Sequence, residues 1–147
     1  FAFLTGRKEK TPFFKRKIMA NAAEILKELI DGLNFLSDMD DCWDMFIPTA
    51  RRSGPVTSAQ MAALTRLTFF AAVDFDTFMD HTINSQTISQ GAAVGERYRA
   101  VKAAFIEHLM QRKVFKMVST PNRYEYYAVG IDKQNNLIGI YVSSVET

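Results

Sequence analysis

The 147-residue chain is long enough to form one domain with its own hydrophobic core, and 48% of its residues are hydrophobic, including 12 Phe. No apolar run approaches the roughly 18 residues that a membrane-spanning helix needs. The single Cys42 excludes an internal disulfide, and together with His81 and His108 it cannot supply a zinc site of ordinary spacing. We therefore expect an intracellular protein of the cytoplasm or an organelle matrix, such as that of mitochondria, with no metal of its own.

The net charge of +2 conceals a basic N-terminal arm. Residues 1–18 carry six basic residues and one acidic residue, a net charge of +5, whereas residues 19–147 carry 12 basic and 15 acidic residues, a net charge of −3. Such an asymmetry bears on partners rather than on the fold. We expect a single domain over 19–147, preceded by a segment that is a solvated leader, the remnant of an organelle-targeting leader, or a docking arm. The basic residues of this arm are Arg7, Lys8, Lys10, Lys15, Arg16 and Lys17.

The first part of the domain predicts a helix, a loop and a strand. Apolar residues recur at helical spacing over residues 22–33, with charged residues on the opposite face. Asn21 is placed to cap this helix, and Glu24 three residues later completes a capping box. Residues 37–41 form a polar loop, and the alternation over 43–49 predicts a strand that a loop rich in Pro, Gly and Arg terminates.

The middle of the chain predicts a helix, a strand and a short helical turn. Thr57 and Gln60 have the spacing of a second capping box, which opens a helix to about residue 67. Residues 69–75 have the composition of a buried strand. Asp76 is then expected to cap a short helical turn over residues 77–81.

The last part of the chain changes from helical to strand periodicity. Residues 82–93, rich in Ser, Thr, Gln, Asn and Gly, are expected to form the longest polar loop, and residues 94–109 a strong amphipathic helix. Strands are predicted over 114–118, 124–131 and 137–145, joined by short turns into an antiparallel meander. The order of elements indicates an α+β fold, a sandwich in which helices cover a mainly antiparallel sheet.

No pattern in the sequence assembles a catalytic centre. The acidic stretch SDMDDCWD at 37–44 resembles the start of a calcium loop but lacks the glycine and the terminal glutamate that such a loop requires. Asp74 and Asp76 would share one face of a strand, as paired acid–base carboxylates do, but a strand end and a helix cap also explain them. Phosphate-binding, dinucleotide-binding and nucleophile-elbow motifs are absent from the sequence. We therefore expect a protein without enzymatic activity and without a cofactor.

Four stretches of the chain are distinctive in their order and spacing. They are ILKELIDGLNFLSDMDDCWDMF at 25–46, PVTSAQM at 55–61, VDFDTFM at 73–79 and NLIGIYVSSVET at 136–147. Together they resemble the bacterial inhibitors of sugar-nonspecific nucleases, the nuclease A inhibitor (NuiA) family, over roughly residues 22–147. The resemblance implies an α-β-α sandwich similar to that of the pathogenesis-related-1 proteins, and no catalytic activity.

The resemblance also implies how such a protein acts. An acidic residue in the loop after the first helix and the C-terminal Thr reach into the nuclease active site, and these positions fall on Asp38 and Thr147 in this sequence. We expect Glu146, the acidic residue beside Thr147, to take part in partner binding as well. Nonspecific nucleases hold a phosphodiester with a divalent metal and cationic side chains. A terminal carboxylate, ionised at neutral pH, could replace a water on such a metal, and Asp38 could pair with an arginine that otherwise binds phosphate.

Two functions of different kinds therefore remain open. The first is a non-enzymatic inhibitor of a metal-dependent nuclease, which Asp38 and the Val-Glu-Thr ending favour. The second is a structural accessory subunit of a larger assembly, for example in an organelle, and the basic arm favours this function. A family domain can be recruited for such a role because a fold does not fix one function. Both imply a protein partner rather than direct contact with nucleic acid or a membrane span.

Overall fold

The structure is a computed structural model that describes residues 21–51 and 54–146. The basic residues of the N-terminal arm and Thr147 lie outside these ranges. In the described part of the chain a two-stranded sheet, β1-β2, accompanies a five-stranded antiparallel sheet with the order β3-β7-β6-β5-β4. The strands are β1 (Asn34–Leu36), β2 (Asp40–Cys42), β3 (Asp44–Phe46), β4 (Thr68–Val73), β5 (Met110–Thr120), β6 (Arg123–Ile131) and β7 (Leu137–Val145).

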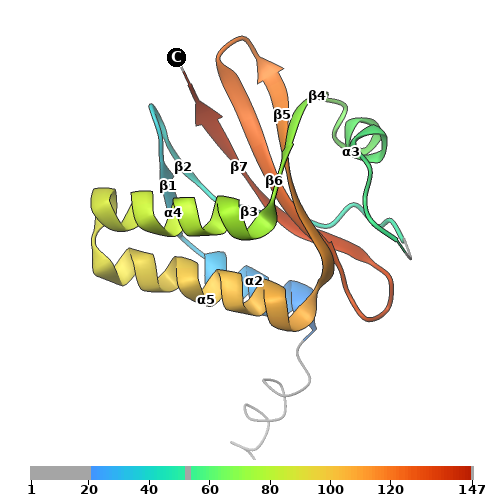
Figure 1. Cartoon of the computed structure of the whole chain (residues 1–147), viewed down its shortest axis with the longest axis horizontal. Helices are drawn as coiled ribbons and strands as arrows, with labels where there is room; N and C mark the ends of the chain where they lie inside the picture. The colour runs from blue at the N-terminus through green and yellow to red at the C-terminus, as the bar shows by residue number, and fades with distance from the viewer. Residues whose placement is uncertain (1–20, 52–53, 147) are drawn as a thin grey trace, which may run out of the picture.

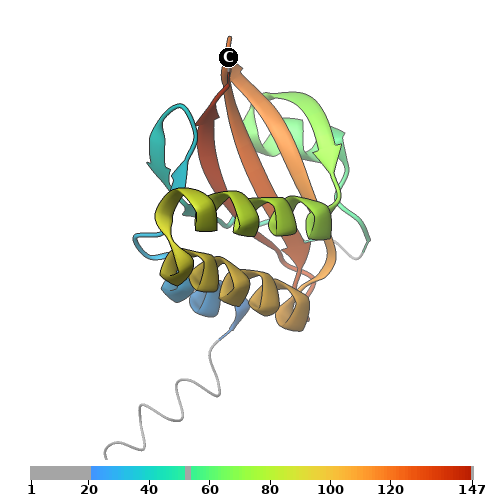
Figure 2. The ribbon, with the colours of Figure 1, turned by 60° about the vertical axis from the view of Figure 1, so that its left-hand side comes forward.

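Helices cover both faces of the five-stranded sheet (Figure 1). On one face α2 (Ala22–Ile30), α4 (Phe75–Gln90) and α5 (Ala92–His108) form a layer, and Figure 2 shows α4 and α5 side by side in front of the strands. On the other face α3 (Ser58–Thr65) packs through Met61 over a second hydrophobic cluster. Successive residues of β6 alternate between the hydrophobic core on the side of α2, α4 and α5 and the cluster on the side of α3, as the pleat of a strand requires. The expected α+β sandwich is confirmed.

The two predicted capping boxes have different outcomes. At the start of α2, the Asn21 side chain accepts a hydrogen bond from the Glu24 N–H and the Glu24 carboxylate accepts one from the Asn21 N–H, so this capping box is confirmed. At the start of α3, the Thr57 hydroxyl accepts from the Gln60 N–H, but the Gln60 Oε1 is buried without a partner among the described residues. Thr57 is therefore a simple N-cap, and the predicted second capping box is wrong.

The structure corrects the predictions for residues 69–93. The strand β4 ends at Val73, lies at an edge of the sheet and leaves the Phe70 side chain 53% exposed, so it is not a buried strand. Asp74, rather than Asp76, caps the following helix by accepting hydrogen bonds from the N–H and the hydroxyl of Thr77. That helix, α4, continues through the predicted polar loop as far as Gly91, whose φ of +102° ends it.

The predicted helix over 94–109 and the three-stranded meander are confirmed. The turns that join the strands contain Asn122 and Asn135 with φ of +66° and +65°, a conformation that Asn adopts more readily than most residues. The second turn is closed by Asp132, whose carboxylate accepts hydrogen bonds from the N–H groups of Gln134 and Asn136. Strand β7 therefore returns along β6 and brings Glu146 beside the turn between β5 and β6.

Candidate functional site

The hairpin of β1 and β2 carries Asp38 at its tip. The two strands pair from Asn34 with Cys42 to Leu36 with Asp40, so the tip consists of residues 37–39. The Ser37 hydroxyl and backbone bond to the backbone of Met39 and close the tip. Asp38 is exposed at the turn, in the loop after the first helix, where the resemblance placed an acidic contact residue. The predicted polar loop at 37–41 is thus the tip of a hairpin together with part of its second strand.

Helix α4 holds this hairpin through side-chain amides. Gln86 is only 2% exposed, and its Nε2 and Oε1 bond to the carbonyl and the N–H of Leu36, each at 3.0 Å. The amide thereby substitutes for a neighbouring strand on the free edge of β1. Gln90 donates from the same helix to the carbonyl of Asn34 at 3.0 Å. The Tyr98 hydroxyl of α5 also donates to that carbonyl, at 2.5 Å, and accepts a hydrogen bond from the Trp43 indole.

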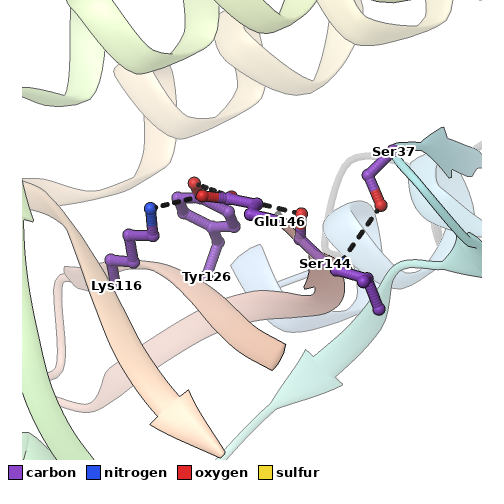
Figure 3. A network of polar contacts seen from close by, with 6 residues as sticks. Ser37, Lys116, Tyr126, Ser144 and Glu146 are labelled. Carbon is purple, nitrogen blue, oxygen red and sulfur yellow. Dashed lines mark hydrogen bonds and ion pairs between the residues drawn. The ribbon is translucent and has the colours of Figure 1, made fainter. Parts of the chain in front are cut away.

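The second strand of the hairpin and its tip are both bonded to β7. The Asp41 carboxylate accepts a hydrogen bond from the Ser143 N–H at 2.9 Å. The Ser37 hydroxyl accepts a longer one from the Val145 N–H at 3.4 Å, and Figure 3 shows Ser37 at this contact. The residue before Asp38 is therefore bonded to the residue before Glu146. Residues separated by more than 100 positions in the sequence are brought to one edge of the molecule by these two contacts.

The Glu146 carboxylate is bound within the protein. Its Oε1 accepts a hydrogen bond from the Lys116 ammonium at 2.6 Å, and its Oε2 accepts from the Tyr126 hydroxyl at 2.6 Å and the Ser144 hydroxyl at 3.3 Å (Figure 3). Burial raises the pKa of Glu146, but the hydrogen bonds and the charge of Lys116 outweigh this effect, and the net pKa is lower than usual. The carboxylate is thus ionised and paired at neutral pH. Its backbone N–H also donates to the Asn122 carbonyl at 2.9 Å.

Three aromatic rings surround the ammonium group that pairs with Glu146. The Nζ atom of Lys116 lies 4.3 Å from the ring centroid of Tyr124, 5.0 Å from that of Phe70 and 5.5 Å from that of Tyr126. At these distances the negative face of each ring attracts the cation. The Lys116 side chain is 16% exposed, so its ion pair with Glu146 is shielded from much of the solvent.

Comparison with known proteins identifies the family. The model of the nuclease A inhibitor-like proteins (NuiA) matches residues 20–147, which is most of the chain. The chain belongs to the nuclease A inhibitor-like family. A search of the curated proteins found no match. Membership supports a role of the nuclease-inhibitor type in general, and thus a protein partner in general.

In this NuiA-like chain the paired-carboxylate interpretation of Asp74 and Asp76 is not supported by their surroundings. Asp74 is a helix cap whose pKa is lowered by hydrogen bonds from the backbone and hydroxyl of Thr77, and Asp76 lies in the first turn of α4. Within residues 21–51 and 54–146, no group of three or more His, Cys, Asp or Glu side chains could hold a metal ion. No helix in the described part of the chain is long and apolar enough to cross a membrane.

The sequence prediction missed four residues that organise this edge of the NuiA-like domain: Gln86, Asp41, Lys116 and Tyr126. A signal existed for the last two, because the predicted turn between β5 and β6 places Lys116 opposite Tyr126 on neighbouring strands. For Gln86 and Asp41 no local signal exists, since their partners are 50 and 102 residues away.

Proposed function

We propose that this NuiA-like protein, without catalytic activity of its own, inhibits a metal-dependent, sugar-nonspecific nuclease. Asp38 and Thr147 enter the active site of the nuclease and occupy the position of the phosphodiester. The observation that carries the proposal is the bond between Ser37 and Val145, which holds the loop of Asp38 beside the end of β7. An acidic loop and the end of a strand that are held on one edge can reach one active site together, whereas two separate flexible segments would each lose ordering entropy on binding.

The chemistry of a nuclease site suits this pair of groups. Such a site binds a negatively charged phosphodiester through a divalent metal and cationic side chains. A Mg²⁺ ion keeps exchangeable waters and accepts oxygen ligands, so a carboxylate can replace a water on it. The exposed Asp38 carboxylate suits a bidentate pair with an arginine. Both oxygens of Glu146 accept hydrogen bonds within the protein, so the proposal assigns no partner contact to Glu146.

The proposal is tested by inhibition of a purified Mg²⁺-dependent, sugar-nonspecific endonuclease. Plasmid degradation is followed while the protein is titrated in. Asp38→Ala should weaken binding by about 2–5 kcal/mol, the usual effect of truncating one member of a buried charge pair. Asp40→Ala is the matched control, because Asp40 is an exposed carboxylate of the same hairpin and is not assigned a contact.

A second pair of variants tests the end of the chain. A short C-terminal tag, or deletion of Thr147, should weaken inhibition strongly while the melting temperature stays unchanged. Failure of the untagged protein to inhibit at large excess would refute the proposed function. Equal inhibition by tagged and untagged protein would refute the part assigned to Thr147.

The accessory-subunit role is kept as a second candidate because of one observation, the net charge of +5 over residues 1–18. A basic segment of this kind suits docking on an acidic protein surface. Changing Arg7, Lys8 and Lys10 together to Ala separates the two roles. In an inhibitor this change should alter mainly the salt dependence of nuclease binding. In an accessory subunit it should remove the protein from a large assembly on native gels of its source cells.

A further inference from the structure

We infer that the sheet face around Tyr141 is a docking surface for an arginine side chain of a protein partner. This Tyr141 surface consists of the rings of Tyr127 and Tyr141 and the carboxylates of Asp41, Asp44 and Glu125. It includes none of the residues that the proposed function brings into a nuclease active site, so the inference goes beyond that function. A protein partner in general is what membership of the family supports.

The Tyr141 surface lies on the face of the five-stranded sheet that also carries α3. Helix α3 packs on β4 and β5, at one side of this face (Figure 1), whereas β3 and β7 form its other side. Phe46 and Tyr141 belong to the hydrophobic cluster of this face, so Asp44 and Ser143, two residues away on the same strands, point to the same side. Asp44 is exposed and the other three residues are half-buried, which leaves this part of the face accessible to a partner.

Tyr141 supplies a flat aromatic surface. Its ring is stacked on that of Tyr127, with the centroids 5.2 Å apart and the ring planes at 11°. The Phe46 ring packs with its edge against Tyr127, at 5.0 Å between centroids, and supports the pair from β3. Strand β7 lies between β6 and β3, so Tyr141 is opposite Tyr127 on one side and Asp44 on the other. The face of the Tyr141 ring that Tyr127 does not cover is therefore turned towards Asp44.

Three carboxylates from three strands surround the Tyr141 ring. Asp44 lies opposite it on β3, and Asp41 lies on β2, which is bonded to β7. Glu125 lies on β6, where its Oε1 accepts a hydrogen bond of 2.6 Å from the Tyr127 hydroxyl. Burial raises the pKa of Tyr141, and the negative charges of Asp44, Glu125 and Asp41 raise it further, in keeping with their positions around the ring.

None of these three charges is neutralised by a cation of the described chain. The ion pairs within residues 21–51 and 54–146 do not include Asp41, Asp44 or Glu125. Arg123 lies on the same face of β6, two residues before Glu125, but no ion pair joins them in this part of the chain. Among the described residues each of the three carboxylates accepts its hydrogen bond through one oxygen, so the second oxygen can accept a bond from a partner. A bound cation would also relieve the repulsion between the three negative charges.

A guanidinium group suits the Tyr141 surface better than an ammonium group does. It is planar, stacks on an aromatic ring and presents a rigid fork of donors to a carboxylate, whereas the ammonium of lysine is a compact and strongly hydrated charge. The free face of the Tyr141 ring and the Asp44 carboxylate lie side by side, so one guanidinium can contact both. At an exposed site the ring contact and the ion pair each change affinity by about 2- to 5-fold.

The test is an NMR titration of the full chain with three short peptides. The peptides share one Gly and Ser sequence and carry two arginines, two lysines or two citrullines, and citrulline has the shape of arginine without its charge. We expect the arginine peptide to shift the signals of Tyr141 and Ser143 in a saturable way. The lysine peptide should bind about 2- to 5-fold more weakly, and the citrulline peptide should leave these signals unchanged.

Four variants locate the binding site. Asp44→Asn and Glu125→Gln remove a charge but keep a hydrogen-bond acceptor, and Tyr141→Leu removes the ring but keeps an apolar side chain. Each should weaken binding of the arginine peptide by about 2- to 5-fold. Asp40→Asn is the matched control, because Asp40 is an exposed neighbour of Asp41 that points to the opposite face of β2, and it should leave the affinity unchanged.

Several results would overturn the inference. These are unchanged Tyr141 signals with the arginine peptide, equal affinity for the arginine and citrulline peptides, or the same affinity in Asp44→Asn as in Asp40→Asn. A variant that starts at Met19 tests whether the basic residues 1–18 occupy the surface instead. In that case its Tyr141 signals, without peptide, would differ from those of the full chain in the direction opposite to the peptide shift. Signals that change with protein concentration alone would indicate a second copy of the chain as the occupant.

Discussion

Replacing Gln86 by Met should detach the Asp38 hairpin from helix α4. Methionine has nearly the volume of glutamine and the same unbranched shape, so packing in the buried site is retained. The two hydrogen bonds to the backbone of Leu36 are lost, together with the bond that Gln90 donates to Gln86. The variant therefore isolates the effect of the side-chain amide on the hairpin.

The expected loss in the free energy of unfolding follows from two backbone groups, the N–H and the carbonyl of Leu36, which lose their partner. An unsatisfied buried N–H or carbonyl costs about 1–3 kcal/mol, and the half-buried position of Leu36 favours the lower part of this range. Two such groups give about 2–3 kcal/mol. In a domain of this size each kcal/mol lowers the melting temperature by about 2–4 °C, so a decrease of about 4–12 °C is expected.

Thermal unfolding followed by circular dichroism and hydrogen exchange at the Leu36 amide measure these effects. The matched control is Asn84→Met, which places the same side chain on the exposed face of α4 and breaks no hydrogen bond that anchors the hairpin. We expect rapid exchange at Leu36 only in Gln86→Met. If both variants melt within about 2 °C of the unmodified protein and Leu36 stays protected, the amide does not anchor the hairpin.

Three further predictions concern the cap of α4, alkaline pH and the N-terminal segment. Asp74→Ala should lower the melting temperature more than Asp76→Ala, because only Asp74 caps the helix; equal effects would contradict this assignment. Burial raises the pKa of Tyr98 and that of Tyr127, and the hydrogen bond to Glu125 raises the pKa of Tyr127 further. The stability that these residues contribute is therefore complete below about pH 10 and is lost as the pH rises through their raised pKa. Melting temperatures and tyrosinate absorbance between about pH 9 and 12 should show stability falling above about pH 10, and a constant melting temperature would contradict the assignment. A variant that starts at Met19 should keep the circular dichroism spectrum and melting temperature of the full chain, whereas a decrease of several degrees would mean that residues 1–18 pack on the domain.

The predictions from sequence succeeded where periodicity was strong and failed where polar residues were buried by distant partners. Helix α5 and the three strands of the meander show clear periods, because each buries one face against the layer beside it. Helix α4 was predicted as a loop beyond residue 81, because Ser, Thr, Asn and Gln favour loops locally. In the fold, Thr82 and Gln86 lie in buried positions of that helix, and Gln86 bonds to a strand 50 residues away.

Local patterns and the order of motifs were enough to predict the family, the α+β class, the cap of α2 and the position of Asp38 in the loop after the first helix. These features depend on residues that are close in the chain, or on motifs whose order can be read directly along the sequence. The surroundings of Asp38 and Glu146, by contrast, depend on how distant segments pack in the fold. Antiparallel return of β7 beside β6 brings the Glu146 carboxylate to Lys116 and Tyr126, and the hairpin contacts bring Ser37 to Val145. These bonds join residues 20 to 108 positions apart. Local turn signals predict the meander, but the packing of segments that are distant in the sequence sets which side chains meet at its end.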